Sequence, residues 1–311
     1  MPKKKKKTRE DIEKEKARIE LLLEMAWSTS SEDRMWAIAS QILEINPDRV
    51  EALLLEADNT DNPEFAINYL KDASYALGDP DNYAEGDKDL LFLTINQRLA
   101  FHYLSLGDFD NAFKAAETAV RFAEKHADDE YIYDEANNTL MKAVYYRILI
   151  EHRDWQRILT ESMRDADVTL GRAYARLIAS WFVTSKRDKN LCAGLFWDTL
   201  AIAPDVPFYI LSYFDEPDDN APSEAVEDFH FALMYYDTVT ITEEFFNWFS
   251  RGVILFGLLS GRFDDREESY VLDVLDRLGG FDDYEKMKNI LLGTEDSEVI
   301  EALAANKCLV D

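Results

Sequence analysis

The chain has 311 residues, 47% of them hydrophobic, and it contains 62 Asp and Glu against 34 Lys and Arg. This hydrophobic content is enough to bury a sizeable core. The formal charge of −28 disfavours non-specific binding to nucleic acid or to an anionic membrane. No apolar run reaches the roughly 20 residues that a membrane helix needs, so we expect a cytoplasmic protein with no membrane partner.

The N-terminus differs in charge from the rest of the chain. Lys3 to Lys7 form an unbroken basic run that precedes any apolar periodicity, which predicts a disordered basic tail over residues 1–9. One interpretation is a solvated tail with no further role. The other is an electrostatic arm that binds RNA, a ribosome or phospholipid, or a nuclear localisation signal in a eukaryotic host.

The remaining chain has the periodicity of short amphipathic helices. Apolar residues recur at three and four positions, and the few glycines and prolines fall between such segments. The pattern predicts helices at residues 8–28, 31–45, 49–57, 63–77, 88–106, 109–126, 130–152, 154–164, 168–184, 188–203, 222–237, 242–260, 264–278, 283–292 and 296–306. Their short connections predict antiparallel neighbours. Thr240 and Glu243 have the spacing of a capping box.

A repeat is visible between residues 99 and 120. The turn from Leu106 to Phe109 is followed by Ala112, Ala116 and Ala119 at spacings of four and three. These small residues allow paired helices to approach closely. The stretch resembles a tetratricopeptide repeat with the register 93–126, and Pro47 and Pro204 resemble the prolines that end such repeats, which adds units at 16–49, 139–172 and 173–206. The resemblance implies an all-α fold, a right-handed α-α superhelix of repeats.

A second resemblance covers residues 200–250. The segment from Ala203 to Leu211, with Ser223 to Ala225 and the aromatic helix after it, is similar to the C-terminal module of bacterial tetratricopeptide proteins related to the suppressor of tumorigenicity seven family. It implies a helical continuation without catalytic residues. An acidic loop from Asp215 to Pro222 separates the parts. We therefore predict repeats over 10–211 and, over 222–311, a helical module that caps the solenoid.

The sequence has no enzymatic signature. It lacks a phosphate-binding glycine loop, a Gly-x-Ser-x-Gly motif, a His-Glu-x-x-His motif and a dinucleotide fingerprint. Cys192 and Cys308 are far apart, and no histidine has a second ligand at helical spacing, so we predict neither a metal site nor a cofactor. We expect a protein that is not an enzyme. An enzyme with an unrecognised acidic site stays open as an alternative.

The repeat resemblance implies a groove lined by the first helix of each pair, which holds extended peptides or helices. Its groove positions in this chain are Gln97, Arg98, Phe101, Ser105, Arg147 and Trp181. Aromatic and arginine side chains could anchor a peptide carboxylate and an apolar side chain. The alternative is that Phe101 and Trp181 belong to the core.

These observations favour a scaffold or adaptor that binds a protein or peptide of basic character, because the acidic body attracts cationic partners. The rival hypothesis is an RNA- or ribosome-associated factor that uses the Lys3 to Lys7 arm. The identity of the partner and the oligomeric state are left open by the sequence.

Overall fold

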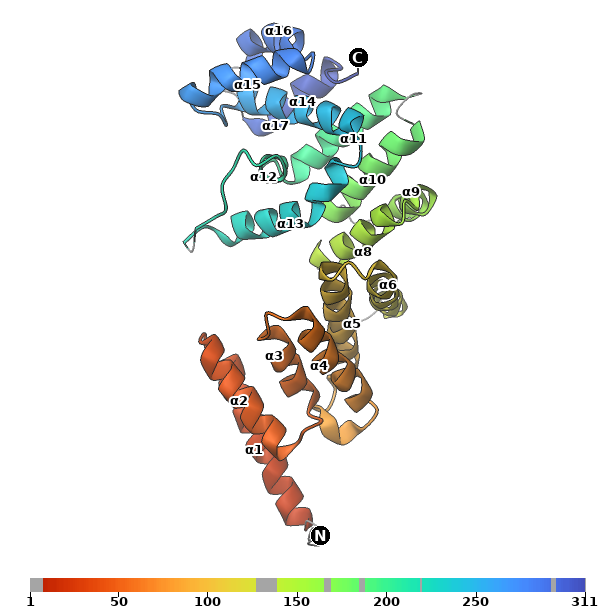
Figure 1. Cartoon of the computed structure of the whole chain (residues 1–311), viewed down its shortest axis with the longest axis vertical. Helices are drawn as coiled ribbons and strands as arrows, with labels where there is room; N and C mark the ends of the chain where they lie inside the picture. Colours follow the sequence, from red (N-terminus) through yellow and green to blue (C-terminus); the bar gives the residue numbers. More distant parts are fainter. Residues whose placement is uncertain are drawn as a thin grey trace. The chain divides into compact units, whose positions relative to one another are not determined.

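The computed structural model describes residues 8–126, 139–164, 169–184, 188–218, 220–291 and 295–310. Within these ranges the chain forms 16 α-helices and one short 3-10 helix, and it has no strand (Figure 1). The prediction of an all-helical protein is therefore confirmed. The Lys3 to Lys7 run lies outside the described residues. The chain divides into two compact units, unit 1 (residues 1–138) and unit 2 (residues 139–311).

Unit 1 is built from consecutive helices that each contact the next. They are α1 (Arg9–Trp27), α2 (Glu32–Ile45), α3 (Val50–Asp58), α4 (Pro63–Ala76), α5 (Lys88–Ser105) and α6 (Phe109–Lys125). The 3-10 helix η1 (Pro80–Asn82) lies between α4 and α5. It was not predicted from the sequence, because three residues are too few to show a period.

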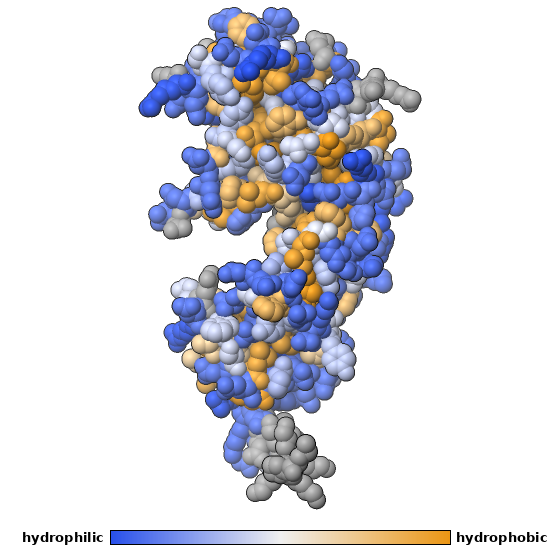
Figure 2. Space-filling view, viewed as in Figure 1, coloured by the Kyte–Doolittle hydropathy of each residue, from blue (hydrophilic) through white to orange (hydrophobic). Residues whose placement is uncertain are grey.

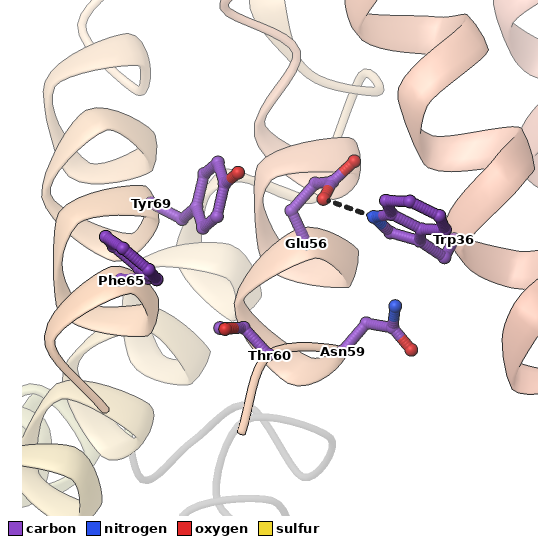
Figure 3. A pocket seen from close by; sticks show the side chains of 6 residues that line it. All are labelled: Trp36, Glu56, Asn59, Thr60, Phe65 and Tyr69. Carbon is purple, nitrogen blue, oxygen red and sulfur yellow. Dashed lines mark hydrogen bonds between the residues drawn. The ribbon is translucent and has the colours of Figure 1, made fainter. Parts of the chain in front are cut away.

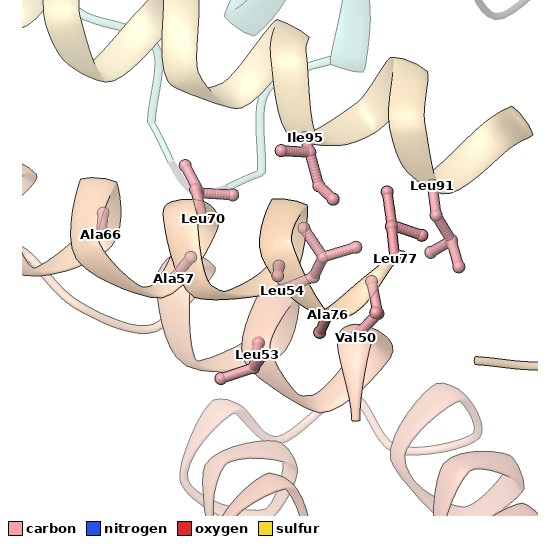
Figure 4. Packing of buried hydrophobic residues seen from close by; sticks show 11 residues of the cluster. Val50, Leu53, Leu54, Ala57, Ala66, Leu70, Ala76, Leu77, Leu91 and Ile95 are labelled. Atoms are coloured by element: carbon pink, nitrogen blue, oxygen red, sulfur yellow. The ribbon is translucent and has the colours of Figure 1, made fainter. Parts of the chain in front are cut away.

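One hydrophobic core cluster of unit 1 lies between α3, α4 and α5 (Figure 4), and a second joins α1, α2 and α3. Leu54 of α3, Leu70 of α4 and Ile95 of α5 meet there, and all three are buried. Ala57 and Ala66 are completely buried in the same cluster, and their small side chains let α3 and α4 approach closely. The burial of this apolar surface stabilises α3 and α4, which are short for isolated helices, and joins them to α5.

Unit 2 contains the remaining described helices. They are α8 (Thr139–Glu151), α9 (Trp155–Arg164), α10 (Leu170–Thr184), α11 (Lys189–Ile202), α12 (Val206–Ile210), α13 (Ser223–Val239), α14 (Glu243–Ser260), α15 (Asp265–Arg277), α16 (Phe281–Leu291) and α17 (Asp296–Ala305). The helix predicted at 130–152 corresponds to α8, and its first nine residues lie outside the described ranges. The five-residue α12 was not predicted, since it is barely longer than one turn.

The centre of the C-terminal part of unit 2 is α14, which contacts α13, α15, α16 and α17. Its side chains are buried on nearly every side, including Phe245, Trp248, Phe249 and Phe256. A helix that is apolar all round is stable only inside a protein. Hydrophobic residues accordingly gather around α11 and α14, whereas α15 is mainly hydrophilic (Figure 2).

The division between the units differs from the predicted boundary. Residues 215–218 and 220–222 are exposed or half-buried, and both flanking segments belong to unit 2. The reason is that α13 packs on α8. The hydroxyl of Tyr235 donates to the carbonyl oxygen of Ala143 at 2.9 Å, and the Tyr235 ring stacks on Phe231 at 4.3 Å between centroids. The units instead divide between residues 138 and 139, inside the predicted repeat range 10–211.

The helices α8 and α10 approach each other at a glycine. A Cβ atom placed on Gly171 of α10 would lie 2.5 Å from Cα of Ala143 and 2.9 Å from its backbone nitrogen. Both distances are well below normal van der Waals separation, which is about 3.5 Å or more between heavy atoms. Only glycine therefore allows this contact between the two backbones.

The helix caps correct one prediction from the sequence. Thr240 follows the end of α13, and α14 is capped by Thr242, whose hydroxyl accepts from the backbone N–H of Phe245 at 3.2 Å. Glu243 is therefore the first residue of α14 and stands too early to close a capping box. A complete capping box instead begins α15, where Asp264 and Glu267 bond to each other's backbone N–H groups.

Arg262 connects three segments of unit 2. Its guanidinium donates to both carboxylate oxygens of Asp296, at 2.8 and 2.7 Å, and to Asp205 at 3.0 Å. It also lies over the ring of Phe256, 4.6 Å from the centroid. Burial lowers the pKa of this guanidinium, but the two carboxylates outweigh burial and raise it overall. Arg262 thus holds the start of α12 and the start of α17 against the end of α14.

Candidate functional site

Unit 1 has a cavity of about 330 Å³ between α2, α3 and α4 (Figure 3). We call it the Glu56 pocket, and its lining residues are Trp36, Glu56, Asn59, Thr60, Phe65 and Tyr69. Figure 3 shows Trp36 on one side, Phe65 and Tyr69 on the other, and Glu56 between them. The pocket therefore combines three aromatic rings with one carboxylate.

Helical spacing explains how each helix contributes to this pocket. Phe65 and Tyr69 are four residues apart on α4 and share one face. On α2, Trp36 and Ser40 are also four apart, and both donate to Glu56 of α3. Residues separated by four positions lie above one another on a helix, so each pair presents two side chains to the same space.

The connection between α3 and α4 shapes the mouth of the pocket. It is short because Asn62 caps α4, accepting from the backbone N–H of Glu64 at 2.9 Å, and because Pro63 occupies the first helical position. Proline is favoured at that position because it has no N–H to satisfy. Asn59 and Thr60, at the end of α3, are thereby held beside Phe65 at the start of α4.

Glu56 is the unusual residue of the site. Its side chain is only 8% exposed, and its oxygens accept from Trp36 Nε1 at 2.8 Å and Ser40 Oγ at 2.9 Å. Both donors are neutral, and no ion pair joins Glu56 to another of the described residues. A buried carboxylate without a cation is unfavourable, because the two hydrogen bonds replace only part of its hydration. The site therefore offers a buried carboxyl group with which a cation of a ligand can form an ion pair.

Glu51 is the other buried carboxylate among the described residues, and it is paired with a cation, as buried carboxylates usually are. Its Oε2 lies 2.7 Å from Nε of Arg49, and its Oε1 accepts from the backbone N–H of Ala84 at 2.8 Å. Burial raises the pKa of Glu51, while Arg49 and the backbone hydrogen bonds oppose that rise. Glu51 therefore has a cationic partner within the unit, whereas Glu56 accepts only from neutral donors.

A larger cavity, of about 510 Å³, lies where the loop before α5 meets α1. It is lined mainly by charged side chains, four of which already form ion pairs. Lys16 lies 2.6 Å from Asp81, and Arg49 lies 3.0 Å from Glu20. Since these four charges are paired within the protein, the cavity is a weaker candidate for a ligand than the Glu56 pocket.

Four of the predicted groove residues lie together on α5. Gln97, Phe101 and Ser105 are spaced by four, and Phe101 is 46% exposed. Arg98 forms an ion pair with Asp58 of α3 at 2.7 Å. Burial lowers the pKa of Arg98, an effect that the nearby Asp58 carboxylate opposes. These residues belong to the same unit as the Glu56 pocket, but they do not line it.

The other two predicted groove residues are buried in unit 2. Arg147 is 6% exposed, donates to the carbonyl oxygen of Met234 at 2.8 Å and pairs with Glu151. Trp181 is also 6% exposed and packs on Trp248, with ring centroids 4.7 Å apart. The structure therefore does not place either side chain on an accessible surface of the described residues.

The Glu56 pocket was missed by the sequence analysis, although two local signals point to it. Glu56 interrupts an apolar helix in which Leu53, Leu54 and Ala57 are buried, so a helical wheel would place a carboxylate beside the core. Phe65 is an aromatic residue in the first turn of α4, and its side chain is exposed. No repeat register brings Trp36 of α2 to these residues.

We also searched the described residues for a metal site and for a membrane-spanning helix. Among the described residues, no group of three or more His, Cys, Asp or Glu side chains is arranged to hold a metal ion. In the same part of the chain, every helix is too short or too polar to cross a membrane. Comparison of the chain with family models, curated proteins and solved structures finds no match. The function of this chain is therefore inferred from the geometry of the site.

Proposed function

We propose that this protein is a non-catalytic scaffold that binds a basic segment of a partner protein through the Glu56 pocket. The observation that carries the proposal is Glu56 itself, a buried carboxylate that has no cation among the described residues and that opens into a pocket between exposed Trp36 and Phe65. A lysine or arginine side chain of the partner would supply the missing positive charge.

The aromatic rings favour the same kind of ligand. Trp36 is 50% exposed and Phe65 is 59% exposed, although large aromatic side chains are usually buried. The face of an aromatic ring attracts a cation, and the attraction grows when the cation is removed from water. The pocket provides both conditions, because the cation would leave water to reach Glu56.

The charge around the pocket supports capture of a basic partner. Residues 32–76, which contain α2, α3 and α4, have ten Asp and Glu against three Lys and Arg. This excess attracts cationic segments over several ångströms and speeds their encounter with the pocket. The last turn of α3 adds the negative end of a helix dipole beside Asn59 and Thr60.

The arrangement of the helices supports a scaffold. Consecutive helix pairs joined by short turns are the building unit of tetratricopeptide-like proteins, and the proposal includes such a right-handed superhelix as the overall architecture. In that architecture Phe101 and its neighbours Gln97 and Ser105 on α5 extend the binding surface beyond the pocket. A partner would then insert one basic side chain at Glu56 and lie along the helices with its remaining residues.

A titration of the full chain tests this proposal. The probe is a fluorescent peptide in which Lys and Arg alternate with Ser and Gly, and an acidic peptide of the same length serves as the control ligand. We expect the basic peptide to bind and its affinity to fall as salt increases. We also expect Phe65→Ala to lower the affinity by roughly tenfold, because one ring face is lost. Tyr75→Ala is the matched control, because Tyr75 lies on the same helix, is 89% exposed and does not line the pocket.

Two results would overturn the proposal. Equal affinity of the Phe65→Ala variant would show that the peptide binds elsewhere, and equal affinity for the acidic peptide would show that charge does not select the ligand. A parallel titration with single-stranded RNA examines the rival function. RNA binding that is lost when Lys3 to Lys7 are replaced by glutamine, without any peptide binding, would favour the RNA-associated factor.

A further inference from the structure

We propose that the Glu56 pocket selects arginine over lysine, and that Glu56 is the residue that determines this specificity. The inference rests on the proposed function, because it names which basic side chain the pocket takes. It starts from the number and direction of hydrogen bonds that Glu56 still lacks.

The two oxygens of Glu56 are each half satisfied. Oε2 accepts from Trp36 Nε1 at 2.8 Å, and Oε1 accepts from Ser40 Oγ at 2.9 Å. A carboxylate has about four acceptor positions, two on each oxygen. Each oxygen of Glu56 therefore has one position left, and the two existing bonds fix the plane of the carboxylate. Glu56 can therefore accept two further donors, one at each oxygen.

The arginine side chain matches that demand. Its planar guanidinium presents two parallel N–H groups that bond to both oxygens of one carboxylate, whereas the lysine ammonium is a point charge that cannot place two parallel donors. A trimethylated lysine has no N–H at all. Lysine would thus leave part of the acceptor demand of Glu56 unmet, in a position that water reaches poorly because Glu56 is only 8% exposed.

The walls of the pocket favour a flat cation. The hydrogen bond to Glu56 fixes the orientation of the Trp36 indole, and Phe65 and Tyr69 lie on the opposite side (Figure 3). A guanidinium is weakly hydrated and stacks on aromatic faces, so it loses less on entering such a space than an ammonium does. The volume of about 330 Å³ exceeds that of about ten water molecules, which leaves room for the guanidinium and its stem.

The mouth of the pocket offers acceptors for the remaining N–H groups. Guanidinium has five donors, and two of them would bond to Glu56. Asn59 and Thr60 line the pocket at the end of α3, and the side chain of each carries an oxygen that can accept a hydrogen bond. An arginine that enters between α2 and α4 and bonds to Glu56 would have its outer N–H groups left for these two residues. An ammonium on the same path has three donors and leaves more of these acceptors unused.

The test is a series of peptides that differ in one side chain. A common neutral sequence carries Arg, Lys, trimethyllysine or citrulline at its centre, and the affinity of each for the full chain is measured by calorimetry. Citrulline has the shape of arginine without its charge. We expect Arg to bind roughly tenfold tighter than the others, which corresponds to about one charge-assisted hydrogen bond.

A variant assigns the preference to Glu56. Glu56→Gln keeps the volume and one acceptor oxygen but removes the charge and the paired acceptors, so we expect it to reduce the preference for Arg over Lys to roughly twofold or less. Glu44→Gln is the control, because Glu44 is exposed on α2 and does not line the pocket. The indole N–H resonance of Trp36, assigned with Trp36→Phe, should shift when the Arg peptide binds, because Trp36 shares the carboxylate with the ligand.

The outcomes separate this inference from the proposed function. Lys or trimethyllysine peptides that bind as tightly as Arg, with binding lost in Phe65→Ala, would refute arginine selection and leave the cation pocket intact. An Arg preference that survives Glu56→Gln would refute the role of Glu56. No binding by any peptide would refute both proposals. The peptide series on the unaltered protein remains decisive even where a variant fails to fold.

Discussion

Replacing Gly171 with alanine should destabilise unit 2, although alanine is the better helix former. The new Cβ would lie 2.5 Å from Cα of Ala143, so α8 and α10 must separate by about 1 Å to restore normal contact. Overpacking of this kind costs about 1–3 kcal/mol. The separation also lengthens the hydrogen bond of Tyr235 to the Ala143 carbonyl, which contributes about 1 kcal/mol. The higher helix propensity of alanine offsets about 1 kcal/mol of this, so the free energy of unfolding should fall by about 2 kcal/mol.

The assay is urea unfolding followed by tryptophan fluorescence, with Gly194→Ala as the control. Gly194 lies in α11, and a Cβ there meets no atom within 4 Å, so the same substitution should stabilise the protein by about 1 kcal/mol or less. The two substitutions should therefore change the free energy of unfolding in opposite directions. A Gly171→Ala protein as stable as the unaltered chain would refute the argument. Adding Ala143→Gly should not restore stability, because the closest atoms belong to the backbone.

Three further predictions concern unit 2. Burial, with neighbouring carboxylates, raises the pKa of Asp228 to about 6, so the folded protein binds this proton more tightly than the unfolded chain and loses stability as pH rises from about 4 to about 6. Asp228→Asn should therefore stabilise the protein at pH 7.5 by about 1 kcal/mol after allowance for solvent screening, and should leave its melting temperature unchanged near pH 4. The Arg262 hydrogen bonds lower the pKa of Asp296, so this carboxylate stabilises the fold above its unfolded pKa near 3.9 and loses that effect as pH falls below it. Arg262→Lys should lower the unfolding free energy at pH 7 by about 1–2 kcal/mol. It should also reduce the loss of stability at acid pH, measured by urea titrations at several pH values. Thr242→Ala should lower the thermal stability by about 1 kcal/mol and Thr240→Ala by less than about 0.5 kcal/mol, a ranking that would reverse if Thr240 were the true cap of α14.

The helices could be predicted because their periodicity is a local property. In α6 the buried residues Ala112, Ala116, Ala119 and Ala123 recur at three and four positions, so one helix length contains the whole signal. The cap of α14 was misplaced by two residues because Thr240 and Thr242 are both good capping residues. Only the backbone of Thr242, which is extended with φ −138° and ψ 147°, distinguishes them.

The site could not be predicted in the same way, because it depends on which helices meet. A repeat register assigned Trp181 to a groove by its position in a 34-residue period. Its burial results from α14, which returns to cover it with Trp248 more than 60 residues later. Likewise, nothing local to α2 shows that Trp36 donates to a carboxylate of α3. Sequence periods report the buried face of each helix but not the partner that covers it.

The hydrogen bond from Tyr235 to Ala143 has a consequence for the order in which the protein folds. It joins residues 92 positions apart, and Trp248 similarly donates to Leu309 across 61 positions. In unit 1, each helix packs on the next. Long loops are slower to close than short ones, so the helices of unit 1 should reach their native contacts first. Pulsed hydrogen exchange should then protect the amides of α3 and α4 before those of α8, and simultaneous protection would contradict this order. During synthesis, α8 and α10 would remain without their partner until α13 has been made, which is the period in which unit 2 is most exposed to aggregation.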